Sequence, residues 1–253
     1  MINLLINTGS LKDLIGSMVT IESVAQKEKS AKFDVLVKKG NESLLDNHPL
    51  IKEILIWDPE KSNTNTIVEI NSFIHKQKYH KIYTLSQSGV SKSILKGIER
   101  IKIKSFDSPW KKLLGIRGNY YPKDKALPEF WVAFGKLASD VSQSSAPKYY
   151  ITAKEQRNTS PLKRNDYTIL LMDEVDLETN KSKIKQILES IPNENAIYQW
   201  SRYAWKHPKL PLSKTVLNLS EKLSILEVLD LMKSGNVYSF NSEYNSLKLW
   251  INL

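Results

Sequence analysis

Short apolar runs alternate along the chain with segments of helical spacing. Between these runs, apolar residues recur three and four positions apart, first at Leu14, Met18 and Ile21 and then from Ile67 to Ile74, which predicts amphipathic helices. Strands and helices that alternate in this way predict a parallel sheet covered by helices on both faces. Five runs in the first half read as the strands of such a sheet: Ile2–Asn7, Lys32–Val37, Ile51–Trp57, Lys81–Leu85 and Arg100–Lys104.

The second half of the chain repeats this alternation. A basic and aromatic stretch, 106–122, precedes a helix opened by Pro128, and polar stretches at 142–148 and 155–165 predict a domain boundary near residue 160. We therefore predict an α/β protein with two Rossmann-like doubly wound domains, over residues 1–150 and 160–253, the second one smaller, and ligands at the carboxyl ends of the strands. The expected elements of the second domain are strands Tyr167–Met172, Ala196–Trp200, Thr215–Leu219 and Asn236–Phe240 and helices Lys181–Ile191 and Ile225–Met232.

Composition and charge narrow the function classes. Among 253 residues, 37 Lys and Arg stand against 27 Asp and Glu, and residues 1–120 carry 19 of these cations against 12 of the acids. Such an excess favours an anionic partner, which could be nucleic acid, an anionic membrane surface or a phosphorylated glycolipid. The absence of cysteine excludes disulfides and thiolate catalysis. No apolar run reaches membrane-spanning length and the first residues lack signal-peptide features, so we expect a cytoplasmic protein, soluble or peripheral on the inner membrane.

The first strand-to-helix turn holds the main candidate for chemistry. Asp13 falls on the first turn of a helix at the carboxyl end of strand Ile2–Asn7, a position that faces ligand in doubly wound folds. A purely structural interpretation is equally specific, because Ser10 and Asp13 have the spacing of a capping box at a helix N-terminus. On spacing alone, the capping interpretation is favoured over a catalytic one.

The same residues resemble a known family. Leu4–Leu14 is similar to the opening of glycosyltransferase family 9, the lipopolysaccharide heptosyltransferases, which have an apolar strand, Arg-Thr-Ser-Ser-or-Gly, an apolar residue, Gly and Asp. The resemblance continues through Phe33–Val37, His48–Leu55, Tyr79–Ser88 with Ser91–Ser93, and Val216–Met232. It implies the GT-B fold, with an acceptor-binding N-terminal domain and a donor-binding C-terminal domain.

The resemblance also implies an activity and a set of site residues. Asp13 matches the family's catalytic carboxylate, the general base of an inverting, metal-independent transfer from a nucleotide-diphosphate sugar to a lipopolysaccharide-type or other cell-surface glycan. No cofactor is expected beyond that co-substrate. The residues expected to bind the acceptor are Ser10, Lys12, Ser88, Lys92, Lys111 and Lys112, and those expected to bind the donor are Thr8, Gly9, Asn241 and Ser242.

The donor half departs from the family pattern. The family's Asp-Ser-Gly-Pro-x-His is replaced by Asn241–Ser246, in which Glu243 stands at the glycine and adds a charge that repels a diphosphate. Asp173–Asp176 stands where a Lys-x-Trp-Pro feature is usual, and the chain ends at Leu253, sooner than family members do. A divergent, C-terminally short relative that has lost catalysis, and binds an anionic glycan or supports a partner glycosyltransferase, is therefore the alternative.

Two further features leave open what the basic half contacts. The stretch from Trp110 to Arg117 mixes basic, aromatic and apolar residues, which suits an acceptor's phosphates, a sugar ring or an anionic bilayer, but equally an ordinary surface loop. Nucleic acid is not expected, because the chain lacks both a recognition helix and the aromatic strand pattern of RNA-binding domains.

Overall fold

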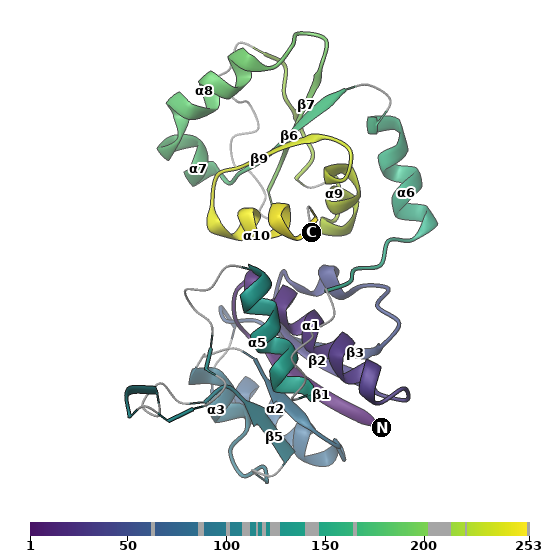
Figure 1. The fold of residues 1–253 in the computed structure, drawn as a ribbon, viewed down its shortest axis with the longest axis vertical. Helices are drawn as coiled ribbons and strands as arrows, with labels where there is room; N and C mark the ends of the chain where they lie inside the picture. The colour runs from purple at the N-terminus through teal and green to yellow at the C-terminus, as the bar shows by residue number, and fades with distance from the viewer. Residues whose placement is uncertain are drawn as a thin grey trace. The chain divides into compact units, whose positions relative to one another are not determined.

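The computed structural model divides the chain into two compact units, Met1–Tyr149 and Tyr150–Leu253. Each unit is built around one parallel sheet (Figure 1). The structure describes residues 1–61, 64–85, 89–99, 102–107, 112–114, 116–117, 120–121, 127–139, 147–163, 166–201, 214–220 and 222–251.

The sheet of the first unit has the strand order β3-β2-β1-β4-β5, all parallel. The central strand β1 (Ile2–Asn7) lies between β2 (Lys32–Lys38) and β4 (Ile82–Thr84), with β3 (Ile51–Trp57) and β5 (Ile103–Ser105) at the edges. The direction of strand progression reverses between β1 and β4. Ligands of doubly wound sheets bind at the carboxyl ends of the strands at such a switch point.

Helices cover both faces of this sheet. Helices α1 (Leu11–Lys27) and α5 (Leu127–Ser139) pack against each other on one face. On the other face, α2 (Thr64–Lys76) and α3 (Gly89–Ile94) enclose a core that includes Leu4, Ile6, Leu36, Trp57, Ile74, Tyr79, Ile82 and Ile94. A short 3₁₀ helix, η1 (Glu42–Leu45), lies between β2 and β3.

The second unit is a smaller version of the same design. Its four parallel strands have the order β8-β7-β6-β9, with β6 (Tyr167–Leu171) between β7 (Ala196–Trp200) and β9 (Asn236–Ser239), and β8 (Leu217–Asn218) at the edge. The strand order reverses between β6 and β9. This reversal is the switch point of the second unit.

One face of this second sheet packs on α8 (Lys181–Ser190), whose Ile184 and Leu188 belong to the same buried core cluster as Leu170. Near the other face, the Tyr167 hydroxyl donates to the Leu231 carbonyl of α9 at 2.7 Å. The bounds of the remaining helices are α6 (Ala153–Thr159), η3 (Ser160–Lys163), α7 (Glu174–Thr179), α9 (Ile225–Met232) and α10 (Ser242–Ile251). Among the helices in the described ranges, none has the length and apolar character that crossing a membrane requires.

The predicted fold class, two Rossmann-like α/β units, is confirmed, but the predicted linker at 155–165 is wrong. Thr152 and Glu155 form a capping box that starts α6, and η3 follows directly. Two polar side chains of this segment bind a buried acid of α9. Thr159 Oγ1 and Lys163 Nζ both donate to Asp230 Oδ2, at 2.5 and 2.6 Å. Residues 142–146 of the other predicted linker, 142–148, lie outside the described residues.

Candidate active site

The turn between β1 and α1 is held in one conformation by its own polar side chains. The Gly9 amide donates to Asn7 Oδ1 at 3.0 Å, and Asn7 Nδ2 donates to Ser17 Oγ at 2.5 Å. Asn7 and Ser17 are fully buried and Thr8 is nearly so. The turn therefore holds the first residues of α1 in a fixed orientation at the carboxyl end of the central strand.

Asp13 lies on the first turn of α1 and completes the predicted capping box. Ser10 Oγ accepts from the Asp13 amide at 3.3 Å, while the amide and the hydroxyl of Ser10 both donate to Asp13 Oδ2 at 2.9 Å. Asp13 is buried, with 7% of its surface exposed to solvent. The structural interpretation of the pair is thus confirmed, and it occupies one carboxylate oxygen.

The second carboxylate oxygen has a partner from a distant part of the chain. The hydroxyl of Tyr121 donates to Asp13 Oδ1. The Tyr121 ring meets Phe106 edge to face with 5.5 Å between ring centroids, and Phe134 of α5 at 6.4 Å. Burial and the neighbouring Asp13 raise the pKa of the Tyr121 hydroxyl, which therefore remains a donor at neutral pH.

Sequence reasoning missed Tyr121 as a partner of Asp13. Its position inside the basic and aromatic stretch was the only available signal, and nothing in the spacing connects that stretch to α1. Aromatic contacts explain the position of Tyr121. The ring centroids of Phe106 and Phe134 lie 5.0 Å apart, and the two rings form a small cluster with Tyr121 beside the α1 N-terminus. The result is a carboxylate oriented by donors on both oxygens, one of them a hydroxyl.

The expected acceptor-binding residues are only partly brought together. Ser10 and Lys12 lie beside Asp13 in the turn and first helical residues, whereas Lys92 is exposed on α3 and Lys112 is exposed in the short segment 112–114. In the described part of the chain, the side-chain partners of Asp13 are Ser10 and Tyr121, and neither lysine is among them. Two further expected residues, Ser88 and Lys111, lie outside the described residues.

In the second unit, Asn241 follows the carboxyl end of β9 at the switch point. Its side-chain amide donates to Asp176 Oδ2 at 2.8 Å and, at 3.4 Å, to Asp173 Oδ2, while its carbonyl oxygen accepts from the Tyr244 amide at 3.0 Å. Both functional atoms of Asn241 are therefore engaged within the unit. Ser242 begins α10, and the structure does not describe its side chain.

A polar network joins the carboxyl ends of three neighbouring strands around Asp173. Asp173, just after β6, accepts on Oδ1 from Ser201 Oγ, just after β7, at 2.5 Å and from the Tyr244 hydroxyl of α10 at 2.6 Å. Its amide donates to Asp176 Oδ2 at 2.9 Å. Two carboxylates thus stand at the position where a doubly wound unit binds a ligand, and they are satisfied by groups of the same unit.

The sequence pointed to this network through Asp173–Asp176, as a departure from the family pattern, and through Asn241, an expected donor-binding residue. Ser201 and Tyr244 were missed because they meet Asp173 from 28 and 71 residues away. As for metal ligands, the ranges described above contain no group of three or more His, Asp or Glu side chains that could hold an ion.

Comparisons with known proteins agree on the fold. No family model and no curated protein sequence matches the chain. Similar solved structures include a family 9 glycosyl transferase from Veillonella parvula, at 10% identity and a TM-score of 0.67 over 99% of this chain and 78% of that one. Two Escherichia coli structures cover this whole chain: heptosyltransferase WaaC with ADP-2-deoxy-2-fluoro heptose (15% identity, TM-score 0.67, 86% of that chain) and ADP-heptose LPS heptosyltransferase II (13%, 0.65, 82%).

These likenesses show that the chain shares the fold of heptosyltransferases of the GT-B type, as the sequence resemblance predicted.

Proposed function

We propose that this chain is a divergent family 9 glycosyltransferase, an inverting and metal-independent enzyme that moves a sugar from a nucleotide-diphosphate sugar to a lipopolysaccharide-type or other cell-surface glycan. The observation that carries the proposal is the place of Asp13, an oriented carboxylate at the carboxyl end of β1 and at the switch point of the first sheet. The fold shared with heptosyltransferases supports it.

The proposed chemistry is one concerted displacement. Asp13 Oδ1 takes the proton of an acceptor hydroxyl as that oxygen forms a bond to the anomeric carbon of the donor sugar. The bond between this carbon and the diphosphate oxygen breaks, and the nucleoside diphosphate leaves with the electron pair. Attack from the face opposite the diphosphate inverts the configuration. Before the step, the acceptor hydroxyl replaces the hydroxyl of Tyr121 on Oδ1.

The charge distribution supports an anionic acceptor held by the first unit. Residues 1–120 carry 19 Lys and Arg against 12 Asp and Glu, and Lys12 lies next to Asp13. A phosphorylated glycan brings its negative groups to such a surface, and the attraction raises its local concentration. The nucleotide-sugar donor would then be bound by the second unit.

One observation favours the alternative, a relative that binds an anionic glycan or supports a partner glycosyltransferase without catalysis. Asp173 and Asp176 occupy the switch point of the second unit, and Asn241 is engaged by both carboxylates. A diphosphate placed there meets two negative charges, and their repulsion opposes binding. Donor binding therefore separates the two functions more sharply than any other property.

The deciding experiment measures nucleoside-diphosphate release by the purified chain against a panel of nucleotide sugars, each with and without a core-lipopolysaccharide extract. Release that depends on both substrates and is lost in Asp13→Asn supports the transferase. The matched control is Ser10→Ala, which disrupts the same capping box but keeps the carboxylate. No release from any pair, together with no binding of any nucleotide sugar, would favour the binding-only alternative.

Peripheral contact with an anionic membrane surface is a second part of the proposal. Leu113 and Leu114 are 76% and 74% exposed, Ile116 is 49% exposed, and the exposed cations Lys112 and Arg117 flank them. Exposed apolar side chains beside cations are suited to the interface of an anionic bilayer. Cosedimentation with anionic vesicles, compared with neutral ones, tests the contact, and Leu113→Ser/Leu114→Ser is expected to abolish it.

A further inference from the structure

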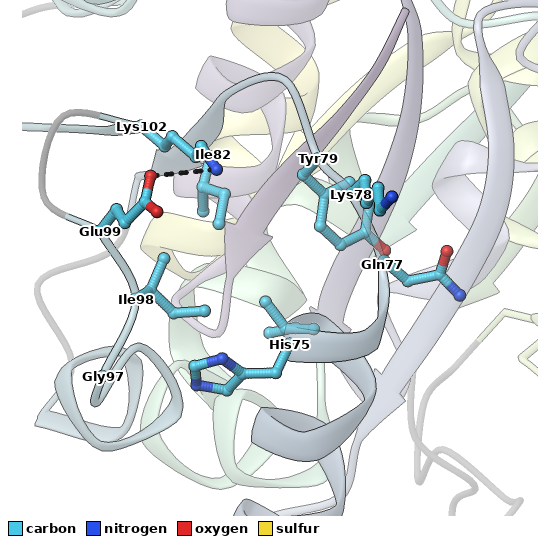
Figure 2. Close-up of a pocket in the computed structure, with 10 residues that line it drawn as sticks. His75, Gln77, Lys78, Tyr79, Ile82, Gly97, Ile98, Glu99 and Lys102 are labelled. Atoms are coloured by element: carbon cyan, nitrogen blue, oxygen red, sulfur yellow. Dashed lines mark ion pairs between the residues drawn. The ribbon is translucent and has the colours of Figure 1, made fainter.

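A cavity of about 400 Å³ lies at the edge of the first sheet opposite to Asp13. It is bounded by the end of α2, by the segment that leads into β4, and by Gly97, Ile98, Glu99 and Lys102, which lie between α3 and β5 in the chain (Figure 2). Because all strands of this sheet are parallel, the amino ends of β4 and β5 are remote from the carboxyl end of β1. The cavity is thus separate from the candidate active site, and its volume falls within the range of small-molecule sites.

The floor of the cavity is apolar. Ile74 and Ile82 are buried members of the core cluster between the sheet and α2, and the half-buried Ile98 packs against the same cluster. Figure 2 shows Ile98 and Ile82 between the polar groups of the rim. A ligand that enters the cavity therefore exchanges water for contact with aliphatic side chains, which favours a compact apolar group.

The rim is positively charged. Lys78 and Lys102 line it, and Glu99, the only acid among the lining residues, pairs with Lys102 at 3.1 Å in a largely exposed ion pair. No ion pair involves Lys78 among the residues that the structure describes. In the sequence, residues 76–104 contain eight Lys and Arg and one acid, a large share of the net positive charge of the chain.

Hydrogen bonds hold the loop at the mouth of the cavity. Asn71 Nδ2 donates to the carbonyls of Ile94 and Lys96 at 2.6 and 3.0 Å, and His75 Nε2 lies 3.2 Å from the Lys96 carbonyl. Gly97 adopts a φ of +83°, which favours glycine, and a Cβ there would lie 3.5 Å from the His75 ring. The hydrogen bonds from α2 fix this loop, so a ligand would not have to order it.

From these observations we infer that the cavity binds a small organic phosphate monoester whose apolar part rests on Ile74, Ile82 and Ile98 and whose phosphate lies at the cationic rim. A phosphate monoester carries between one and two negative charges at neutral pH, which matches a cationic rim. Its ester group supplies the apolar contact that inorganic phosphate lacks. This site is independent of the proposed transferase function, because it uses none of the residues around Asp13.

Titration calorimetry of the full-length chain with phenyl phosphate tests the inference, with inorganic phosphate and phenol as the two half-ligands. We expect saturable binding of phenyl phosphate in the submillimolar range and at least tenfold weaker binding of each half-ligand. Lys78→Gln/Lys102→Gln is expected to weaken phenyl phosphate binding at least tenfold. The matched control, Lys181→Gln/Lys185→Gln, also removes two exposed cations and one exposed ion pair, on α8, and should bind like the unmodified chain.

Three outcomes would overturn the inference: no binding of phenyl phosphate, equal binding of inorganic phosphate, or equal losses in the two double variants. Vesicles that contain phosphatidic acid distinguish a free ester from a lipid headgroup of the same chemistry. Binding to these vesicles that phenyl phosphate cannot displace would overturn the assignment to a free ligand. The calorimetry uses neither the nucleotide-sugar donor nor the glycan acceptor. Absence of phenyl phosphate binding is therefore distinct from absence of glycosyl transfer.

Discussion

Tyr121 donates its hydroxyl to Oδ1 of Asp13, although the two residues are 108 positions apart in the chain. The other carboxylate oxygen, Oδ2, accepts from the amide and hydroxyl of Ser10. Asp13 therefore has one oxygen committed to the helix cap and one oxygen whose partner is a hydroxyl that another hydroxyl can replace. This division of roles lets the capping and catalytic interpretations of Asp13 hold together.

Asp13→Asn separates these roles. We expect transfer to fall by at least about 100-fold, because an amide cannot take the proton of the acceptor, while the amide oxygen still accepts from Ser10. Ser10→Ala is expected to lower the free energy of unfolding by about 1 kcal/mol and, because the carboxylate remains, to lose less transfer than Asp13→Asn. Activity assays and denaturant unfolding of both variants check this. Equal loss of transfer in Asp13→Asn and Ser10→Ala would mean that transfer depends on the helix cap and not on proton removal by Asp13.

Tyr121→Phe tests whether the tyrosine hydroxyl competes with the acceptor. Its removal leaves Asp13 Oδ1 open to an acceptor hydroxyl, so kcat/KM for the acceptor should rise by about fivefold, the equivalent of about 1 kcal/mol for one hydrogen bond. The ring stays in contact with Phe106 and Phe134, which limits other changes. Steady-state kinetics with varied acceptor give the answer. A fall in kcat with unchanged KM would instead make Tyr121 a residue that positions the carboxylate.

Asp176→Asn probes the acidic switch point of the second unit. The amide oxygen of the variant can still accept from the Asp173 amide, while one negative charge disappears. At an effective separation of about 8 Å in a half-solvated site, that charge opposes a phosphate by about 1 kcal/mol, so nucleoside-diphosphate affinity should rise about fivefold. Calorimetric titration with ADP and UDP checks the change. Unaltered affinity would place the donor phosphates away from this network.

Gly235→Ala is expected to destabilise the second unit. A Cβ at this position would lie 2.3 Å from Cε2 of Tyr167, and the Tyr167 hydroxyl is held at 2.7 Å both by the Leu231 carbonyl and by Ser234 Oγ. We expect a loss of about 2 kcal/mol in the free energy of unfolding, typical of overpacking. Adding Tyr167→Leu should relieve the clash. If the loss in the free energy of unfolding of the double variant equals the sum of the losses in the two single variants, the clash with Tyr167 does not cause the destabilisation by Gly235→Ala.

His48 predicts a pH dependence of stability in the first unit. The residue is 4% exposed, with Nε2 3.5 Å from Glu22 Oε1, and Lys148 pairs with the other Glu22 oxygen at 3.2 Å. Burial lowers the pKa of His48 to about 4, against 6.5 in an unfolded chain. The unfolded state therefore binds more protons between these values, and stability falls as pH drops from 6.5 to 4.

The His48 contribution over that pH interval is at most about 3 kcal/mol. In His48→Gln, the contribution of His48 to the pH dependence of stability should be absent. The contribution of the titrating carboxylates remains in both the unmodified protein and the variant. Urea unfolding of the two proteins at pH 7, 5.5 and 4.5 isolates the difference. Parallel pH profiles would show that His48 is not held neutral in the folded state.

The sequence by itself determined the elements that depend on local order. Apolar runs predicted the strands of both sheets, because a strand covered by helices on both faces is apolar along its length. Apolar residues three and four positions apart predicted α1, α2, α5, α8 and α9, because burial of one helix face imposes a period of 3.6 residues, whereas α6 and α10 were not predicted. The capping box of Ser10 and Asp13 was equally readable, since its partners lie three positions apart. Asp13 could be placed just after the strand Ile2–Asn7 from local order, whereas the central position of that strand in the sheet came from the structure.

Only the tertiary structure decided which polar groups meet. The polar segment 155–163 is helical rather than a linker because Asp230, 5% exposed on α9, supplies an acceptor for Thr159 and Lys163. Tyr121 reaches Asp13, and Tyr244 reaches Asp173, only after helices and strands have packed. Such contacts join residues far apart in the chain and leave no periodic trace, so packing alone determines what surrounds each carboxylate.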